Sequence, residues 1–521
     1  MTNESETQAP QSMASRGSNR SAQPYCANFR DFIGDGWGPR PQGPTEALDS
    51  APYAALRRAA IGASFPGERL VIPAGPLKVR SNDCDYLFRP HSAFAHMTGT
   101  GTNFEPDAVL VLHPLTDASS KVAQGEATHE AVLYFRPRAS RSSEEFYANA
   151  RYGELWVGAR PSLEEIQTLT GITCAHIDTL PDALAKDAGP GGVNLRVVLE
   201  ADDAVTSLVD STRSQAGLSS GSEAQASDEA LMEALSELRL TKDPWEVQQM
   251  QNAVDATRAG FDDLIRSIPR AQGHWRGERV LEGAFGAKAR EEGNGVGYET
   301  IAAAGNHANT LHWINNNGPV RSGDLVLVDA GVEVDSLYTA DITRTIPVDG
   351  HFTEPQARVY QAVLDACEAS LAAANKPGAK FRDLHAAAMV VLADRLEKWG
   401  LLPDGVSAEE TLKPEGQFHR RWMVHGTSHH LGIDVHDCAQ ARRDMYMDAE
   451  LEPGMCFTIE PGLYFREDDL KVPEEFRGMG VRIEDDCIVR PDGSVERLSE
   501  SIPRTIDDVE AWITSLIQSD N

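Results

Sequence analysis

Short apolar runs alternate with a helical pattern over the first two fifths of the chain. The apolar runs are "RLVIPAG" (69–75), "DAVLVLHP" (107–114), "EAVLYFRPR" (130–138) and "LRVVLE" (195–200). Runs of this length between turn residues are typical of buried strands. Between them, "SLEEIQTLTG" (162–171) repeats its apolar positions every three residues, as an amphipathic helix does. The alternation predicts an α/β domain.

A different pattern begins at Asp243, which is a helix N-cap followed by Pro244 at the first helical position and Glu246 as the capping glutamate. Two apolar stripes with helical spacing follow: Val247, Met250, Val254, Phe261, Leu264 and Ile265, and later Val359, Val363, Leu364, Cys367 and Leu371. Strand-like segments lie between and after them: "GDLVLVDAGVEV" (323–334), "LYTADITRTIPV" (337–348), "MCFTIEPGLYF" (455–465) and "GVRIEDDCIV" (480–489). This order predicts an α+β domain with antiparallel hairpins.

The two patterns meet in a segment of different composition. Residues 213–230, "RSQAGLSSGSEAQASDEA", are rich in Ser, Gly and Ala and show neither a strand nor an amphipathic helix, which predicts a linker. The first 25 residues are polar, which predicts a disordered tail and no secretory signal. We therefore expect a tail over 1–25, an N-terminal domain over 26–212, a linker over 213–230 and a C-terminal domain over 231–521.

Composition and charge narrow the class of protein. A length of 521 residues suits two domains. The net charge of −31 disfavours nucleic acid as a partner, because a polyanion would be repelled. A membrane-spanning helix needs about 18 consecutive apolar residues. No apolar run in the sequence approaches that length, so no membrane partner is expected. The seven cysteines are scattered without a CxxC spacing, which disfavours a disulfide framework or a thiolate zinc site and suits the cytoplasm.

Two aspartates stand in the strand-like segments around residue 335. Asp329 follows a buried run, and Asp341 comes twelve positions later in the return strand. A hairpin centred on Asp335 would place the two carboxylates directly opposite each other, which destabilises a sheet unless a cation neutralises them. The hairpin alone leaves open that the pair is a turn residue and an ordinary solvent-facing aspartate. Glu333 and Asp335 are weaker ligand candidates, because they lie nearer the turn.

Further acidic and imidazole groups strengthen the metal interpretation. Glu460 ends one apolar strand and Glu484 lies inside another, while residues 424–437, "VHGTSHHLGIDVHD", hold four of the fifteen histidines. Four carboxylates need about four positive charges, which two divalent ions supply. Oxygen ligands with a single imidazole suit manganese, iron or cobalt, and zinc is possible. Two such ions about 3.5–4 Å apart can hold a bridging hydroxide for hydrolysis.

These motifs resemble a known family. The segment 425–437, "HGTSHHLGIDVHD", resembles the motif of aminopeptidase P and prolidase, the M24 metallopeptidases with the "pita-bread" fold. The segments "DAGVEVDSLYTADITRT", "TIEPGLY" and "RGMGVRIEDD" resemble the family's other metal-bearing segments, in the family's order. Upstream, "RSNDCDYLFRPHSAF" and "EPDAVLVL" resemble its N-terminal domain. One departure is that Asp329 and Asp341 are twelve positions apart, where family members have eleven.

The resemblance implies a role for each candidate residue. Five residues would bind two metal ions, preferably manganese, with Asp341 and Glu484 bridging them: Asp329, Asp341, His429, Glu460 and Glu484. Glu460 would also be the general base and then the proton donor to the leaving nitrogen. His436 would bind the scissile carbonyl or the proline side, and His312 would lie beside the substrate. His425 and Arg482 would support the site, whereas His430 occupies a free position of the motif.

The resemblance also implies a substrate and an assembly. The expected activity is hydrolysis of the N-terminal Xaa-Pro bond of peptides through the metal-bridging hydroxide. The alternatives are an Xaa-Pro dipeptidase (prolidase), which shares the metal site, and a non-catalytic binding module on the same fold, which would lack the ligands. The segment "ELWVGAR" (154–160), with Trp156 and Arg160, resembles a part of the N-terminal domain that lies near a partner subunit's site. A homodimer or homotetramer is therefore expected.

Overall fold

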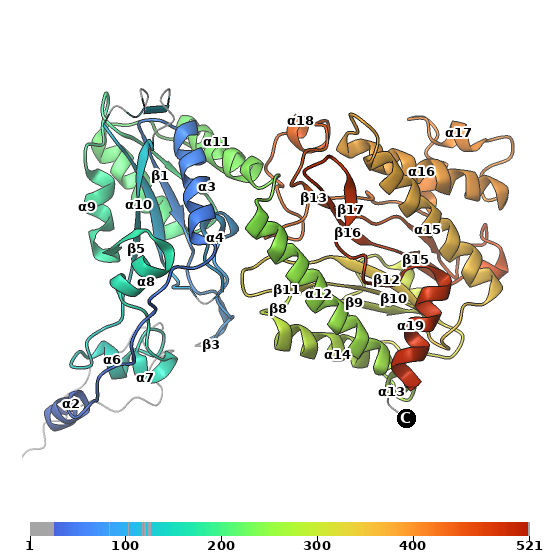
Figure 1. Ribbon diagram of the computed structural model, residues 1–521, viewed down its shortest axis with the longest axis horizontal. Coiled ribbons are helices and arrows are strands. Elements are labelled where there is room, and N and C mark those ends of the chain that lie inside the picture. The colour runs from blue at the N-terminus through green and yellow to red at the C-terminus, as the bar shows by residue number, and fades with distance from the viewer. Residues whose placement is uncertain are drawn as a thin grey trace, which may run out of the picture. The chain divides into compact units, whose positions relative to one another are not determined.

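The computed structural model describes residues 26–518, apart from 83, 103, 117, 119, 120 and 123–126. The tail predicted over 1–25 lies outside the described residues. The chain forms two compact units, the first ending at Leu231 and the second beginning at Met232 (Figure 1). Across the part of the chain that the structure describes, no helix has the length and apolarity to cross a membrane.

The first unit is built on a five-stranded mixed sheet with the strand order β6-β5-β4-β1-β7. Strand β1 pairs antiparallel with β4 and parallel with β7, and β5 pairs antiparallel with β4 and parallel with β6. The strands are β1 (Glu68–Pro73), β4 (Val109–Pro114), β5 (His129–Phe135), β6 (Thr173–His176) and β7 (Asn194–Val197). All four apolar runs of this region are therefore strands, and the predicted α/β class is confirmed.

Helices cover both faces of this sheet. Side chains alternate between the faces, so Val71, Val109 and Val111 pack against α9 and α10, while Leu70 and Leu110 are buried on the other side, where α3 and α4 contact the strands. The helices and short strands of this unit are α2 (Ala27–Gly34), α3 (Ala51–Ser64), β2 (Val79–Ser81), β3 (Cys84–Asp85), α4 (Ser92–Thr98), α6 (Glu145–Ala148), α7 (Glu154–Val157), α8 (Leu163–Thr170), η1 (Ile177–Thr179), α9 (Leu180–Ala185) and α10 (Asp203–Ala216).

The segment predicted as a linker is helical instead. Residues 213–216 end α10, and residues 222–230 belong to α11 (Ser222–Leu238). Arg213 and Asp228, one from each helix, form a buried ion pair at 2.5 Å. Asp228 also accepts a hydrogen bond from the backbone N–H of Val197 in the sheet. The absence of a helix over 213–230 was thus a wrong expectation, because buried pairing orders a segment whose alanines favour helix.

The second unit places its strands between the helix pair α12–α14 and the helix pair α15–α16 (Figure 1). Helix α12 begins as expected: Asp243 is the N-cap, Glu246 completes the capping box and Pro244 is the first helical residue. The helices of this unit are α12 (Pro244–Arg266), α13 (Ile268–Gln272), α14 (Gly277–Glu292), η2 (Gly305–Asn309), α15 (Glu354–Ala374), α16 (Phe381–Lys398), α17 (Ala408–Thr411), η3 (Phe418–Arg421), α18 (Arg443–Tyr446), η4 (Glu474–Phe476) and α19 (Ile506–Gln518).

Antiparallel pairing dominates the strands of the second unit. The pairings are β12-β10-β9, β11-β8, β13-β16-β17 and β14-β15. The strands are β8 (Gly295–Val296), β9 (Ile301–Ala304), β10 (Leu325–Ala330), β11 (Val332–Glu333), β12 (Ile342–Pro347), β13 (Cys456–Ile459), β14 (Gly462–Phe465), β15 (Met479–Arg482), β16 (Asp485–Val489) and β17 (Val495–Arg497). The predicted α+β class is confirmed, with one difference: the segment 480–489 is two strands, and Glu484 lies in the break between them.

The hairpin that carries the two aspartates has another register than expected. Asp329 pairs with Thr343, not with Asp341, and the bridge between Glu333 and Thr339 places the centre of the hairpin at residue 336. Asp341 is therefore a diagonal neighbour of Asp329 and still within reach of the same site. Gly331 is required here, because a Cβ would lie 1.7 Å from the carbonyl oxygen of Ala340.

Candidate metal centre and active site

The nine residues singled out from the sequence line one cavity of about 550 Å³. They are Asp329, Asp341, His312, His425, His429, His436, Glu460, Arg482 and Glu484. Glu333 and Asp335, the weaker ligand candidates, are not in its lining: Glu333 accepts a hydrogen bond from Asn294 at 2.6 Å, and Asp335 is exposed. The cavity therefore collects the expected chemistry from segments more than 100 residues apart.

A tyrosine joins the two aspartates of the hairpin. Asp329 is the last residue but one of β10, and Asp341 immediately precedes β12. The hydroxyl of Tyr298 lies 2.7 Å from Oδ1 of Asp329 and 2.5 Å from Oδ1 of Asp341. The backbone N–H of Asp341 donates to Oδ2 of Asp486 at 3.1 Å. The two carboxylates are thus held side by side by groups from outside the hairpin.

The histidine-rich segment runs along the edge of β13. The backbone N–H of Thr458 donates to the carbonyl of His429, and the N–H of Glu460 donates to the carbonyl of Thr427. This pairing brings the His429 ring toward the carboxylates: Nε2 lies 3.3 Å from Asp341 Oδ2 and 3.7 Å from Glu460 Oε1. Nδ1 of His429 lies 3.1 Å from the carbonyl oxygen of His430 and donates to it, which leaves Nε2 as the inward ligand atom.

Arg482 organises the opposite wall of the cavity. Pairing of β14 with β15 places Arg482 opposite Gly462, next to Glu460 in the chain. Its guanidinium forms an ion pair with Asp329 at 2.5 Å and donates to the hydroxyl oxygen of Tyr464 at 3.0 Å. Its Nε donates to Oγ1 of Thr343, and that hydroxyl donates to Glu484 at 2.6 Å. Arg482 therefore connects Asp329 and Glu484 through fixed hydrogen bonds.

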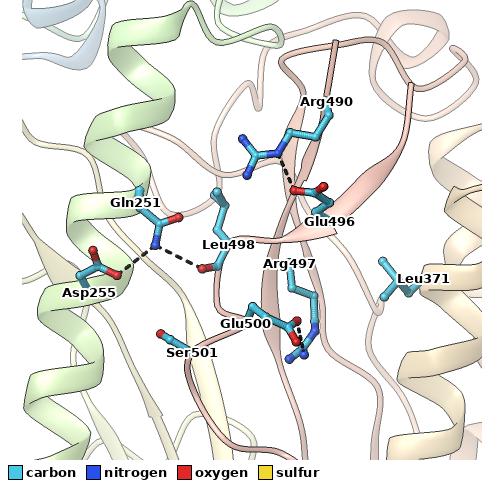
Figure 2. Close-up of a pocket in the computed structure, with 9 residues that line it drawn as sticks. All are labelled: Gln251, Asp255, Leu371, Arg490, Glu496, Arg497, Leu498, Glu500 and Ser501. Carbon is cyan, nitrogen blue, oxygen red and sulfur yellow. Dashed lines mark hydrogen bonds and ion pairs between the residues drawn. The ribbon is translucent and has the colours of Figure 1, made fainter. Parts of the chain in front are cut away.

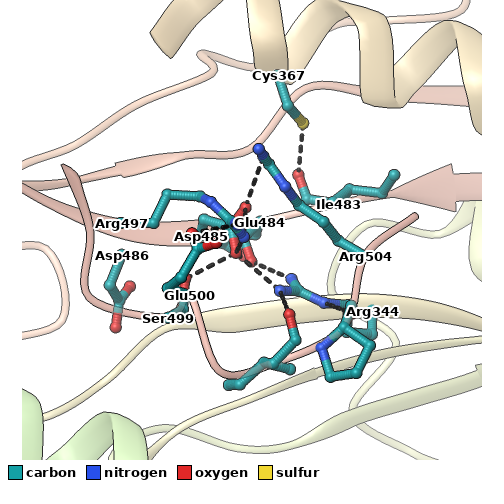
Figure 3. Close-up of polar contacts among 12 residues, drawn as sticks. Arg344, Cys367, Ile483, Glu484, Asp485, Asp486, Arg497, Ser499, Glu500 and Arg504 are labelled. Carbon is teal, nitrogen blue, oxygen red and sulfur yellow. Dashed lines mark hydrogen bonds and ion pairs between the residues drawn. The ribbon is translucent and has the colours of Figure 1, made fainter. Parts of the chain in front are cut away.

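A buried network lies behind Glu484 (Figure 3). Arg344 is fully buried and donates to the carbonyl oxygen of Glu484 at 2.6 Å and to that of Thr343 at 2.9 Å. It also pairs with Asp485 at 2.7 Å. Arg497 and Arg504 approach the same carboxylate, so Asp485 keeps its charge and burial does not raise its pKa, which lies well below its usual value. The backbone at Glu484 is therefore clamped by an arginine.

The positively charged side chains that line the cavity are too few to neutralise its carboxylates. Burial raises the pKa of Glu460 to about 7, with Asp341 adding to the shift and His429 opposing it. Burial, together with the charges of Asp341 and Glu460, raises the pKa of Glu484 well above its usual value. Burial also raises the pKa of Asp329, despite Arg482. Ionised carboxylates are disfavoured here until a cation joins them.

The donor set fits divalent cations. Asp341, His429 and Glu484 each offer a ligand atom, and the three atoms lie within 4.8 Å of one another. Asp329 and Glu460 flank this group, and each carboxylate oxygen that accepts a hydrogen bond retains a lone pair for a metal. Four carboxylates and one imidazole are a hard, mainly oxygen ligand set. The cavity is therefore a candidate centre for divalent metal ions.

The remaining histidines of the segment have different surroundings. The ring of His436 lies 4.5 Å from that of His429 and faces the cavity. Nε2 of His425 lies 2.7 Å from the hydroxyl of Tyr464, and burial next to Arg482 lowers the pKa of His425 to about 4. His430 is fully buried and stacks on Phe381 at 4.5 Å, away from the cavity, as its free position in the motif indicated.

Three site residues were not singled out from the sequence: Tyr298, Thr343 and Tyr464. Tyr464 belongs to the segment "TIEPGLY", so its closeness to Glu460 along the chain was available as a signal. Thr343 lies two residues after Asp341, on the same face of the strand. No local pattern marks Tyr298, which reaches the aspartates from the segment between β8 and β9.

Comparisons with known proteins assign the chain to a family. The fold and the site define a metal-dependent hydrolase class, and the sequence model of metallopeptidase family M24 matches residues 248–491. The model of the aminopeptidase P N-terminal domain matches residues 54–193. Xaa-Pro aminopeptidase 2 of Streptomyces coelicolor is 46% identical over 96% of this chain and 99% of its own length. Xaa-Pro aminopeptidase 3 of Homo sapiens is 32% identical over 90% and 87%.

Solved structures show the same likeness. Zinc-substituted E. coli aminopeptidase P in complex with product has a TM-score of 0.75 and 28% identity, and the match covers 90% of this chain and 99% of that one. Aminopeptidase PepP of Pseudomonas aeruginosa has the same TM-score, identity and coverage. The chain therefore belongs to metallopeptidase family M24, in its aminopeptidase P branch, and its second unit has the pita-bread fold.

Removing the arginine clamp should destabilise the second unit. We expect Arg344→Met, which keeps the volume and removes every hydrogen bond to Glu484, Thr343 and Asp485, to cost about 3–5 kcal/mol of unfolding free energy. Thermal unfolding of metal-free protein measures this. Arg466→Met is the control, because Arg466 is exposed and its pair with Asp468 at 2.9 Å contributes little. Equal melting temperatures for the two variants would contradict the clamp.

Proposed function

We propose that this protein removes the first residue from peptides whose second residue is proline, in a reaction that depends on two divalent metal ions. The observation that carries the proposal is the gathering of five ligand candidates with His436 in one cavity, in a chain 46% identical to an Xaa-Pro aminopeptidase over nearly its whole length. A non-catalytic module on this fold would have no reason to bury four carboxylates together.

The proposed ligands are Asp329, Asp341, His429, Glu460 and Glu484, with Asp341 and Glu484 shared by both ions. Asp341, His429 and Glu484 each contribute an atom to one close group, and Asp341 and Glu484 are nearly fully buried, which supports their role as ligands. When bound, the ions lower the pKa of water and polarise the scissile carbonyl. Manganese is our proposed metal, because four carboxylates and one imidazole suit a hard ion.

The chain's own residues supply the proton transfers and the orientation. Glu460 is the proposed general base and then the acid that protonates the leaving nitrogen. His436 is proposed to donate a hydrogen bond to the carbonyl oxygen as negative charge develops on it. His312 and His425 line the same cavity and would hold the substrate backbone, and Arg482 would keep Asp329 and Tyr464 in place.

Proline imposes a shape on the site. The Xaa-Pro bond is a tertiary amide, so its nitrogen has no N–H and its ring fixes φ. A site for it needs an apolar slot, and Ile301, Leu311, Ile314 and Val435 line the cavity beside the proposed metal ligands. We infer that these side chains receive the pyrrolidine ring.

We also infer a homodimer or homotetramer in the cytoplasm. Leu155, Trp156 and Val157 of α7 are each at least 50% exposed, and such a cluster of large apolar side chains suits an interface between copies. Arg160 is buried and pairs with Glu105, so within "ELWVGAR" the exposed apolar residues are the interface candidates. The buried thiols Cys367, Cys438 and Cys456 suit a reducing compartment.

Metal removal should abolish the activity. Exhaustive chelation is expected to remove hydrolysis of Xaa-Pro peptides, and manganese is expected to restore it. Glu484→Gln should lower the metal content of the purified protein by about two ions and Asp329→Asn by about one, as measured by elemental analysis. Glu496→Gln, an exposed change on β17, is the control. Full activity in protein shown to be metal-free would refute a metallopeptidase.

Separate substitutions of His429 and His436 should distinguish metal binding from catalysis. We expect His436→Ala to keep the metal content of the wild type while kcat falls by about 10²–10³, the loss typical of one stabilising donor. His429→Ala should lower the metal content itself. Equal metal loss in both variants would show that the two roles are divided wrongly.

Substrate length should distinguish an aminopeptidase from a dipeptidase. The rates to compare under manganese are those for an Xaa-Pro dipeptide and for an Xaa-Pro-Xaa-Xaa tetrapeptide. We expect the tetrapeptide to be cleaved efficiently at its first bond. Turnover of the dipeptide alone would assign the protein to the prolidase branch, and equal cleavage of peptides without proline would exclude both branches.

A further inference from the structure

A second cavity adjoins the candidate active site. It has a volume of about 740 Å³. Pockets that bind small ligands typically have volumes of about 300–1,000 Å³. His425, Gly426 and Ser428 line both this cavity and the cavity of the metal centre. Gly426 is exposed, and a Cβ built on it would meet no atom within 4 Å. The two cavities therefore adjoin along the segment 425–428, with open space at its glycine.

One wall of this cavity, which we call the α16 groove, is an exposed stripe of helix α16. Arg382, Ala386 and Val390 stand four residues apart, so they share one face of the helix, and all three are exposed and line the groove. Val390 is 57% exposed, and Val424, on the segment that leads into the metal cavity, is 51% exposed. The groove thus leaves apolar side chains open to solvent, which marks binding surfaces more often than inert ones.

The rest of the groove is adaptable. Three of the eleven methionines line it: Met389, Met423 and Met447. Met389 and Met423 are buried beneath the lining and Met447 is half-buried. Methionine is unbranched and polarisable, so a wall built on it can adjust to ligands of different shapes. Arg420 adds positive charge at the groove in a chain whose net charge is −31, whereas Arg382 is paired with Asp448 at 3.0 Å. Such a surface suits a mainly apolar chain of variable sequence that ends in a carboxylate.

We propose that the α16 groove binds the part of the peptide substrate that follows the proline. This inference rests on the proposed function. An enzyme that removes one residue has only that residue on the amino side of the cleaved bond, so an extended groove that adjoins the metal cavity would serve the carboxyl side. The peptide would pass over Gly426, place its downstream side chains against the exposed Val390 and Val424 and direct its carboxylate toward Arg420.

Another cavity of the second unit lacks these properties. It has a volume of about 640 Å³ and is lined by residues of α12, α15 and β17 and their surroundings (Figure 2). Its charged groups pair with one another, Arg490 with Glu496 and Arg497 with Glu500. It shares no lining residue with the metal cavity. Size alone does not make a substrate groove, and the lining that it shares with the metal cavity at Gly426 distinguishes the α16 groove.

Substitutions that fill or charge the groove should weaken the binding of long peptides and leave the binding of short peptides unchanged. The experiment measures kcat and KM for an Xaa-Pro-Xaa tripeptide and for a heptapeptide with the same first three residues and apolar residues after them. We expect Ala386→Trp and Val390→Asp to raise KM for the heptapeptide about tenfold and to leave both constants for the tripeptide within about twofold. Ala386 and Val390 are exposed, so neither change disturbs the core.

Lys398→Trp is the matched control, since Lys398 is exposed on the same helix and does not line the groove. It should leave both substrates unaffected. Equal KM changes for both peptides, or none for either, in both groove variants would overturn the groove while wild-type cleavage of the tripeptide still stands. Failure of the wild type to cleave the tripeptide under manganese would instead overturn the proposed function, and the groove's role as a substrate subsite with it.

Discussion

The burial of four carboxylates around one imidazole is the constraint on which the second unit depends. Two carboxylates about 4 Å apart repel each other by several kcal/mol in a partly buried site. The chain offsets part of that repulsion with Arg482, which pairs with Asp329, and with the hydroxyl of Tyr298 between Asp329 and Asp341. The raised pKa of Glu484 and that of Glu460, at about 7, show what is left uncompensated. This uncompensated negative charge distinguishes the cavity, as a candidate metal centre, from a set of ion pairs.

Rigidity of the backbone holds these groups together, because most of them lie at strand ends. Of the four carboxylates, only Asp329 lies within a ladder, where it pairs with Thr343. Asp341 precedes β12, Glu460 follows β13 and Glu484 lies between β15 and β16. Strand ends can aim side chains into a common space, but they lack the ladder hydrogen bonds that fix orientation. Arg344, bound to the carbonyl of Glu484, and Thr458, paired with His429, supply the missing bonds. Precision at the site comes from these supporting contacts.

Much of this arrangement could be predicted from the sequence, and the errors have physical causes. The capping box at Asp243 is a local signal, and it placed the start of α12 correctly. The hairpin register was wrong by two residues because the turn uses Leu337 with φ at +75°, a conformation that composition does not indicate for leucine. The break at Glu484 and the helix over 222–230 depend on Arg344 and on the Arg213–Asp228 pair, which are contacts between distant segments. Patterns along the chain cannot contain such contacts.

Selectivity for the amino end of a peptide is a separate problem from the chemistry at the metals. In the proposed reaction the scissile bond must reach the metal centre, Glu460 and His436, and the dipeptidase alternative carries the same requirement. Accepting longer peptides requires open space on one side of the cleaved bond. Gly426 leaves such space where the metal cavity meets the α16 groove, while the adjacent His425 is held by Tyr464 at 2.7 Å. A rigid histidine beside an open glycine would therefore fix the proline and leave the following residues free to vary.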